Sequence, residues 1–518
     1  MLTLWSQEEL QVLSRTNSTR KDRFRVYPER WFILLCACLL ALSNASQWIS
    51  YLSITATTDA FFCGRVQSEA DSCKIGYYSN QIFQFVGMAT GVVGLYVTDK
   101  YGIKLSLICG ATFNALGAVI RFFASLPQME MGARVAVLHT GSVFAAASQP
   151  FFLVLPPKIA EYWFPENQRA LANVLSFIAN PLGVAVGSML PTLLIDESHP
   201  TPESYEMLKL NGIFLALGTI VFMLSVCIRR GCPPTPPSPS SAHHNAFSLR
   251  QGLANIFKTP SYVILLVPFG LAFAINWSVF IVTDAILDSL DYGHMAGYTT
   301  ALAAVAGGVS SIVAGMIVDR TKAFKEVIRI CYAGIVVTSI ALDVLLHHKS
   351  GDSPWMKALM ILLFISLGAF CIPIFPIGIE LGVEMTFPVP EATSSGVLVI
   401  FGNALMFAVS FGMDLLAENV KGYFMHYPFT NNYWLALDFW CVLSVIGLLI
   451  VVFALNPKYK RLEFEQTAIA DSCAESHTDR KGSGSQATEV TNFSQNANDT
   501  STKKERKTSE NQATIYRL

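Results

Sequence analysis

The sequence predicts an all-α membrane protein with twelve transmembrane helices in two six-helix halves. Three observations support this fold class. Of 518 residues, 52% are hydrophobic and only 14% are charged, and the mean hydropathy of +0.44 is far from the balance of a soluble globular protein. Apolar runs of membrane-spanning length recur along the chain, and two short polar signatures occur twice in the same order.

The twelve spans follow from helix length. Crossing a hydrocarbon core of about 30 Å takes about 20 apolar residues. Runs of this kind lie at 31–53, 77–98, 105–125, 133–156, 170–193 and 210–228 in the first half, and at 260–286, 295–318, 326–346, 356–380, 394–416 and 434–455 in the second half. An even number of spans places both termini on one side of the membrane.

The repeated signatures indicate that a six-span bundle has been duplicated. In each copy an acidic and a basic residue at the end of one span are followed by a Glu that precedes a Phe-Pro pair by three residues. The copies are Asp99, Lys100 and Glu161, and Asp319, Arg320 and Glu384. They are offset by 319 − 99 = 220 and 384 − 161 = 223 residues. Because duplicated membrane bundles hold their binding cavity where the repeats meet, this organisation favours a transport function.

The distribution of Lys and Arg predicts the orientation in the membrane. If the N-terminal arm and every second loop are cytosolic, that side carries twenty-one basic residues near the spans and the opposite side carries eight. This bias follows the positive-inside rule and predicts cytosolic termini. We expect the plasma membrane as the location. The net charge of −1 gives no indication of a nucleic-acid partner, and none is expected.

The predicted organisation has five segments. A cytosolic arm at 1–30 precedes the first bundle at 31–228, and a cytosolic linker at 229–258 leads to the second bundle at 259–456. The polar composition of the tail at 457–518 predicts a disordered cytosolic segment.

The linker is expected to change character along its length. It begins with a proline-rich run, in which the missing backbone donors exclude a helix. It ends with Leu249, Leu253, Ile256 and Phe257 at helical spacing, which favours a short amphipathic helix on the inner leaflet.

We interpret the repeated charged residues as gating residues at the cytosolic mouth. Asp99, Lys100, Glu161, Asp319, Arg320 and Glu384 can form charge pairs that keep the mouth closed until the halves move apart. Glu161 and Glu384, at corresponding positions of the halves, supply the acidic partners that such a gate requires. In the alternative interpretation, the basic residues only set the orientation and the prolines only end helices.

Two of the eleven cysteines lie in a polar loop, and most of the others are scattered as small packing residues of the spans. Cys63 and Cys73 fall between the first two spans on the non-cytosolic side, where oxidising conditions permit a disulfide, and they are disulfide candidates. No His or carboxylate cluster accompanies them at ligand spacing, so no metal site is predicted. The chain also has no Walker loop and no Gly-rich dinucleotide turn, so we expect neither an enzyme nor a cofactor.

Several motifs resemble a known family. Gly315 followed by Asp319-Arg320-Thr321-Lys322 resembles the loop motif of the major facilitator superfamily, although the first copy has Leu95 in place of the glycine. Further stretches resemble solute carrier family 49, the relatives of the feline leukaemia virus subgroup C receptor: Ser43–Trp48, Trp163–Ala170, Asn180–Val184, Val318–Phe324 and Val383–Pro388. The similarity runs from Tyr27 to Leu462. It implies the major facilitator fold and transport of choline or ethanolamine, or of haem.

The resemblance also implies a binding site. The positions that match the choline-contacting residues of the family are Trp48, Gln149, Trp277 and Asn403. The last two depart from the better-studied relatives, which carry tyrosine and glutamine there. Trp277 preserves an aromatic face, whereas Asn403 keeps the amide with a shorter reach.

The chemistry of these four residue types suits an organic cation. A quaternary ammonium group donates no hydrogen bond, and a desolvated aromatic face, best of all Trp, attracts it by up to about 2 kcal/mol. Gln149 and Asn403 can bind a hydroxyl group or orient water. In the alternative interpretation, each Trp is an interfacial or lipid-facing residue and each amide is a hydrogen bond between helices.

Ionisable residues within the spans leave a second mechanism open. Asp284 and Asp414, toward the outer ends of spans seven and eleven, are either functional carboxylates or interfacial ones. Haem would need an axial ligand, and His139 alone among nine histidines clearly lies in a span. The leading prediction is a monomeric transporter of a small organic solute that works by alternating access in the lipid bilayer. The alternatives are a haem transporter, and a membrane receptor or scaffold without flux.

Overall fold

The computed structural model describes residues 25–64, 73–195, 204–235, 237, 249–288, 295–347, 354–423, 434–464 and 467. The chain has two compact units, Met1–Arg461 and Leu462–Leu518. All membrane-spanning helices found among the described residues belong to the first unit. Most of the predicted tail, and residues 236 and 238–248 of the linker, lie outside the described residues.

The described residues form helices and contain no strand, so the predicted all-α fold class is confirmed. The helices of the first half are α2 (Glu29–Ile49), η1 (Leu52–Ile54), α3 (Thr55–Cys63), α4 (Ile75–Ala124), α5 (Met131–Ala147), η3 (Gln149–Phe151), α6 (Leu155–Trp163), α7 (Glu166–Leu194) and α8 (Ser204–Val226). Those of the second half are α11 (Pro260–Asp288), α12 (Ala296–Thr321), α13 (Phe324–His347), α14 (Pro354–Cys371), α15 (Ile374–Thr386), α16 (Glu391–Tyr423), α17 (Trp434–Leu449) and the π-helical η5 (Ile450–Ala454).

Eleven of the described helical segments are long and apolar enough to cross a membrane, and one of them contains two of the predicted spans. Helix α4 has 50 residues and is interrupted at Gly102, whose φ of 83° only glycine adopts without strain. This break separates the runs predicted at 77–98 and 105–125, so the described residues contain the twelve predicted spans.

Two spans are broken at corresponding positions of the repeat. The fourth span consists of α5, η3 and α6 with Pro150 at the break, and the tenth consists of α14 and α15 with Pro373 at the break. Their offset, 373 − 150 = 223, equals that between Glu161 and Glu384. Proline interrupts helical hydrogen bonding, so the sequence repeat is also a repeat of backbone geometry.

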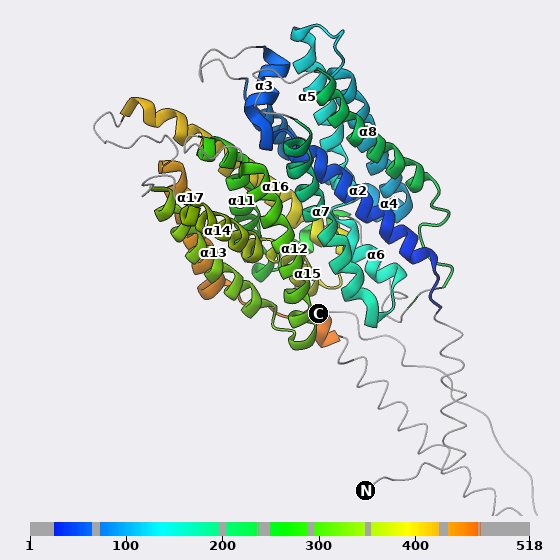
Figure 1. The fold of residues 1–518 in the computed structure, drawn as a ribbon. Coiled ribbons are helices and arrows are strands. Elements are labelled where there is room, and N and C mark those ends of the chain that lie inside the picture. The colour runs from blue at the N-terminus through cyan, green and yellow to red at the C-terminus, as the bar shows by residue number, and fades with distance from the viewer. Residues whose placement is uncertain are drawn as a thin grey trace, which may run out of the picture. The chain divides into compact units, whose positions relative to one another are not determined.

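The halves meet along two pairs of helices. Figure 1 shows α2 to α8 gathered on one side and α11 to α17 on the other. Between these groups, α4 packs against α16 and α7 packs against α12. Any cavity between the halves must therefore lie between these two pairs of helices.

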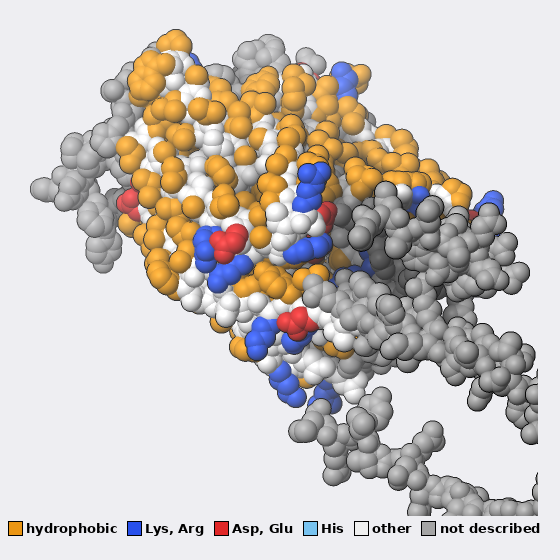
Figure 2. All heavy atoms as spheres, turned by 90° about the horizontal axis from the view of Figure 1, so that it is seen from below, with side chains coloured by type: hydrophobic (Ala, Val, Ile, Leu, Met, Phe, Trp, Pro, Cys, Tyr) orange, Lys and Arg blue, Asp and Glu red, His pale blue; other side chains and the backbone are white. Residues whose placement is uncertain are grey.

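The surface agrees with a protein that is surrounded by lipid. Large apolar side chains are exposed on many spans, among them Val309, Val337, Leu362 and Phe453. Figure 2 shows Lys and Arg side chains in groups on the face seen from below, with hydrophobic side chains covering much of the rest of that view. A lipid-facing apolar surface with charge at one end is expected of a multi-pass membrane protein.

The predicted linker helix is present as α10 (Leu249–Phe257). Its Gly252 and Ile256 are buried. A Cβ atom at Gly252 would contact Val389 and Thr393, so the missing side chain lets α10 approach the turn between α15 and α16 closely. One face of this helix therefore packs on protein, whereas Phe257 is exposed, and contact of the helix with the inner leaflet stays a prediction.

Candidate functional site

A cavity lies between the halves, and all four residues predicted to bind substrate line it. Its empty volume is about 1080 Å³, including the part open to solvent. Trp48 and Gln149 come from the first half, and Trp277 and Asn403 come from the second. The two indoles are only 7% and 6% exposed, so neither side chain faces lipid. The role of these residues in binding remains a prediction.

Helical periodicity explains which residues reach the cavity. On α11 the lining residues are Phe269, Ala272, Phe273, Asn276 and Trp277, and on α2 they are Ala37, Ala41, Ala45 and Trp48. Spacings of one, three and four residues place each set on one helix face. The three alanines of α2 leave open space next to Trp48.

The broken spans contribute a second pair of matching walls. The break in span four supplies Gln149, Phe152, Leu153 and Pro156, and the break in span ten supplies Cys371, Ile372, Phe375 and Pro376. Irregular backbone at membrane depth is tolerated where it is buried in protein or lines a cavity, and transporters place binding sites at such discontinuous helices. The repeated backbone breaks therefore form two walls of the cavity.

Aromatic rings form a continuous wall that joins the halves. The rings of Trp48 and Trp277 meet edge to face with centroids 5.0 Å apart. Phe273 follows at 6.4 Å from Trp277 and stacks on Phe375 at 5.4 Å, and Phe177 of α7 meets Phe375 edge to face at 5.7 Å. The wall therefore crosses between the halves twice.

The polar groups that line the cavity are amides, hydroxyls, the indole N–H groups and a thiol, and none of the lining residues among those the structure describes is charged. The amides of Gln149 and Asn403 converge on Gly87 of α4: a Cβ atom there would lie 2.6 Å from Gln149 Oε1 and 3.3 Å from Asn403 Nδ2. A side chain at position 87 would displace both groups. The described lining therefore offers aromatic faces and neutral dipoles to a solute.

Several lining residues were missed by sequence reasoning. They include Gln84, Ser176, Asn180, Asn276 and Ser311. Asn180 belongs to a stretch that resembles the family, and Asn276 directly precedes Trp277, so both had a signal nearby. No local signal marks the other three as cavity residues.

At one end of the cavity, Asp99 connects the halves. Lys158 of α6 forms an ion pair with Asp99 at 3.4 Å, and Thr393 of α16 donates its hydroxyl to the other oxygen of the same carboxylate. Lys158 also donates to the backbone carbonyl of Thr98 at 2.6 Å. The cation thus comes from the half that contains Asp99, and the contact between halves is a hydrogen bond to Thr393.

The other predicted gating residues are placed differently. Glu161 lies near Glu391, which begins α16. Lys100 and Arg320 are exposed, and Lys100 donates to the hydroxyl of Tyr96 in its own helix. Asp319 is near Lys322, the residue that directly follows α12. Glu384 is near Glu380, and both belong to α15. Within the described part of the chain, the ion pairs found involve neither Lys100 nor Asp319 nor Arg320.

At the opposite end, an ion pair connects the same two helices. Lys74 at the start of α4 lies 3.1 Å from Asp414 of α16. Two turns further along α4 and one turn earlier on α16, Gln81 donates to Ser410 at 2.9 Å. Asp414 thus has a cationic partner in the other half, whereas the side chain of Asp284 lies outside the described residues.

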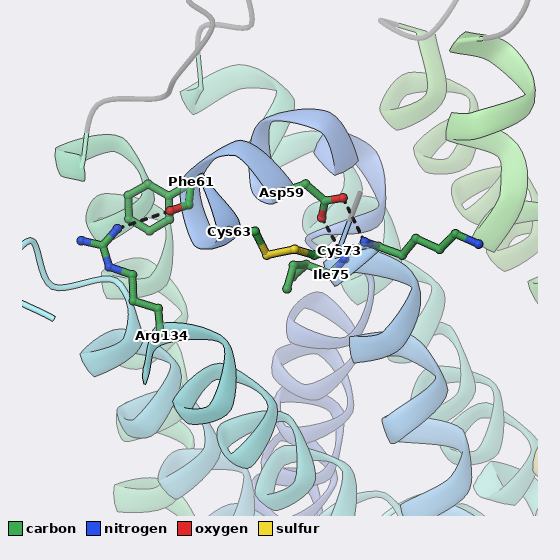
Figure 3. The surroundings of a disulfide bond; sticks show 7 residues. Asp59, Phe61, Cys63, Cys73, Ile75 and Arg134 are labelled. Atoms are coloured by element: carbon green, nitrogen blue, oxygen red, sulfur yellow. Dashed lines mark hydrogen bonds between the residues drawn. A yellow bond between two sulfur atoms is a disulfide. The ribbon is translucent and has the colours of Figure 1, made fainter. Parts of the chain in front are cut away.

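The two disulfide candidates support the residue that forms this ion pair. A disulfide joins Cys63 to Cys73, directly before Lys74 (Figure 3). Asp59 of α3 accepts hydrogen bonds from the backbone N–H groups of Lys74 and Ile75, at 3.0 and 2.8 Å. A carboxylate at a helix N-terminus satisfies unpaired backbone donors, so Asp59 and the disulfide together hold the start of α4 against α3.

Comparison with known proteins places this geometry in a family. The family model described as Major Facilitator Superfamily matches residues 80–413. Solute carrier family 49 member A3 of Xenopus tropicalis is 32% identical over 388 residues, which cover 74% of this chain and 77% of the relative. The chain belongs to solute carrier family 49 of the major facilitator superfamily.

Two further similarities concern this family 49 chain. Choline/ethanolamine transporter FLVCR2 of Homo sapiens is 26% identical over 406 residues, covering 75% of the chain and 71% of the relative. The solved structure of a D-xylose-proton symporter superposes with a TM-score of 0.60 at 17% identity, covering 83% of the chain and 98% of the symporter. The second similarity confirms the major facilitator fold, and the chain is a multi-pass membrane transporter of that superfamily.

Proposed function

We propose that this family 49 chain transports a small organic cation of the choline or ethanolamine kind by alternating access. The observation that carries the proposal is the contact of Trp48 with Trp277 at an uncharged cavity between the halves. Aromatic faces attract organic cations electrostatically and need no hydrogen bond from them. The name of the human relative, a choline/ethanolamine transporter, supports the same solute class.

The composition of the cavity favours a cation over an anion. An anionic solute would meet no Lys or Arg among the lining residues that the structure describes, and it would be repelled by the negative faces of the rings. The same reasoning weighs against haem, whose carboxylates would be buried without a cation. Cys371 and Met406 line the cavity and are of axial-ligand type, whereas His139 does not line it.

Contacts at both ends of the cavity support alternating access. Asp99 and Thr393 join α4 to α16 at one end, and Lys74 and Asp414 join the same helices at the other. If the solute enters from one side and leaves from the other, the two contacts open in turn. Asp99, which accepts a hydrogen bond from Thr393 of α16, and Glu161, which lies near Glu391 of the same helix, are therefore proposed as gating residues of the cytosolic mouth. We further propose that the protein acts as a monomer in the plasma membrane with both termini cytosolic.

The experiment that tests this proposal measures flux and binding separately. Cells that express the chain are compared with cells that do not for uptake of labelled choline and ethanolamine, and choline binding is measured on the purified protein. Saturable uptake that choline analogues inhibit supports the proposal. Binding without uptake would instead support a receptor or scaffold, and inhibition by haem but not by organic cations would support haem transport.

A further inference from the structure

Asn276 of α11 is a buried amide without a hydrogen-bond partner. It is 2% exposed, and neither its Oδ1 nor its Nδ2 is bonded to any described residue. Among the described residues, it is the one buried side chain with two such atoms. Because an unsatisfied buried polar atom costs about 1–3 kcal/mol, a pair of them calls for an explanation.

Amides of the first half show what a purely structural role looks like. Asn44 donates to Asn114 at 3.0 Å and to the carbonyl of Ala145 at 2.8 Å, and Gln47 donates to Asn114 at 3.1 Å. These side chains bond helices together inside one half, and none of them lines the cavity. Asn276 has no such bonds and lines the cavity, directly before Trp277. Its position therefore fits ligand binding better than bonding between helices.

We propose that Asn276 binds a hydroxyl group of the transported cation. This inference rests on the proposed function and narrows the solute to an amino alcohol. A hydroxyl both donates and accepts a hydrogen bond, and the amide offers one acceptor and one donor, whichever way it is turned. The neighbouring Trp277 contributes an aromatic face for the cationic group.

Other unpaired polar atoms of the cavity fit the same ligand. Trp48 Nε1 and Gln149 Oε1 are also buried and unbonded within the described part of the chain, which adds one donor and one acceptor. They come from the first half, whereas Asn276 comes from the second. A solute with one cationic end and one hydroxyl end can contact both halves at once, so its binding depends on how the halves are placed.

The test compares two cations that differ only in the hydroxyl. Binding of choline and of ethyltrimethylammonium to the purified full-length protein is measured by competition against labelled choline, for the native chain and for Asn276→Leu and Asn276→Ala. The matched control is Ser278→Ala, because Ser278 is a buried residue of the same helix with an unbonded hydroxyl that does not line the cavity. Each variant is compared as monodisperse protein of equal amount.

The expected result is selective. Loss of the amide should weaken choline binding about threefold to tenfold while the affinity for ethyltrimethylammonium changes by less than about twofold. Ser278→Ala should change neither. Equal weakening for both cations, unchanged choline binding, or failure of both Asn276 variants to fold would overturn the inference and leave Asn276 a structural residue. If the native protein binds neither cation, the proposed function itself fails, which is a separate outcome.

Discussion

The indole rings of Trp48 and Trp277, one from each half, meet edge to face with their centroids 5.0 Å apart. Both rings border the cavity, so a solute that contacts either ring touches the boundary between the halves. This contact couples recognition to the relative position of the halves, because a movement of one half changes the aromatic surface that the solute meets. Each ring can be tested by itself.

Replacing Trp48 or Trp277 by Ala should weaken choline binding by about 5- to 30-fold, because on the order of 1–2 kcal/mol of cation–π attraction is lost. Phe at either position should retain part of the affinity. The measurement is competition binding to purified protein. Trp355→Ala is the control, since that side chain is 62% exposed and does not line the cavity. If the Ala variants bind choline as well as the native protein does, the two rings are packing residues.

Weakening the contact of Asp99 with Thr393 should favour opening at that end of the cavity. Thr393→Val removes the donor of this charge-assisted hydrogen bond between the halves, and Asp99→Asn removes the charge of its acceptor. The native Cys371 lines the cavity and reports its accessibility. Its alkylation in inside-out vesicles, measured by mass spectrometry, should become several-fold to about tenfold faster.

Lys100→Gln is the control for this experiment, because Lys100 is exposed and bonded within its own helix. Alkylation of Cys371 at the native rate in both variants, with normal surface expression, would leave Asp99 a residue of local structure only. Faster alkylation in the control as well would indicate a general loosening of the fold.

The ion pair of Lys74 with Asp414 should stabilise closure at the opposite end. The side chains are 32% and 18% exposed, so solvent screening limits the pair to about 0.5–1 kcal/mol. Lys74→Gln or Asp414→Asn should therefore raise the open population at this end by about two- to fivefold. Distances between spin labels at Tyr205 and Trp355, which begin spans of different halves, report this opening.

The charge-swapped double variant Lys74→Asp with Asp414→Lys should restore part of the closure. The single variants Lys74→Asp and Asp414→Lys are measured beside it. If the open population of the double variant equals that expected from adding the effects of the two single variants, the two charges do not interact in the membrane.

Much of the fold was predictable because it depends on local sequence. The spans follow from apolar runs, and the two disulfide candidates lie only ten residues apart in one loop. Pro373, at the break of span ten, lies 223 residues after Pro150, which is the offset between Glu161 and Glu384. That the residues next to this break line the cavity is seen only in the structure. The four predicted binding residues line one cavity, yet they came from family resemblance and not from periodicity.

The remaining features depend on contacts between distant residues. Thr393, the partner of Asp99, lies 294 residues away and carries no motif. Lys74 and Asp414 are 340 residues apart. Asn276 is distinguished by the hydrogen bonds that it lacks, which depend on every neighbouring helix and not on its own sequence context.

The proposed orientation predicts which segments are reachable from outside the cell. Epitope tags at position 17 and within 468–518 should bind antibody only after permeabilisation, whereas a tag at position 69 should bind it on intact cells. Antibody binding to the C-terminal tag on intact cells, with the protein at the surface and active, would contradict cytosolic termini.

The most direct test of the central claim is choline counterflow in proteoliposomes. Purified protein is reconstituted into vesicles loaded with unlabelled choline, and the entry of external labelled choline is followed. This assay needs no knowledge of ion coupling or of transport direction. The account predicts saturable counterflow that ethanolamine inhibits, that Trp355→Ala retains, and that the Trp48→Ala and Trp277→Ala variants lose. Absence of counterflow with folded native protein, or counterflow that both cavity variants retain in full, would contradict it.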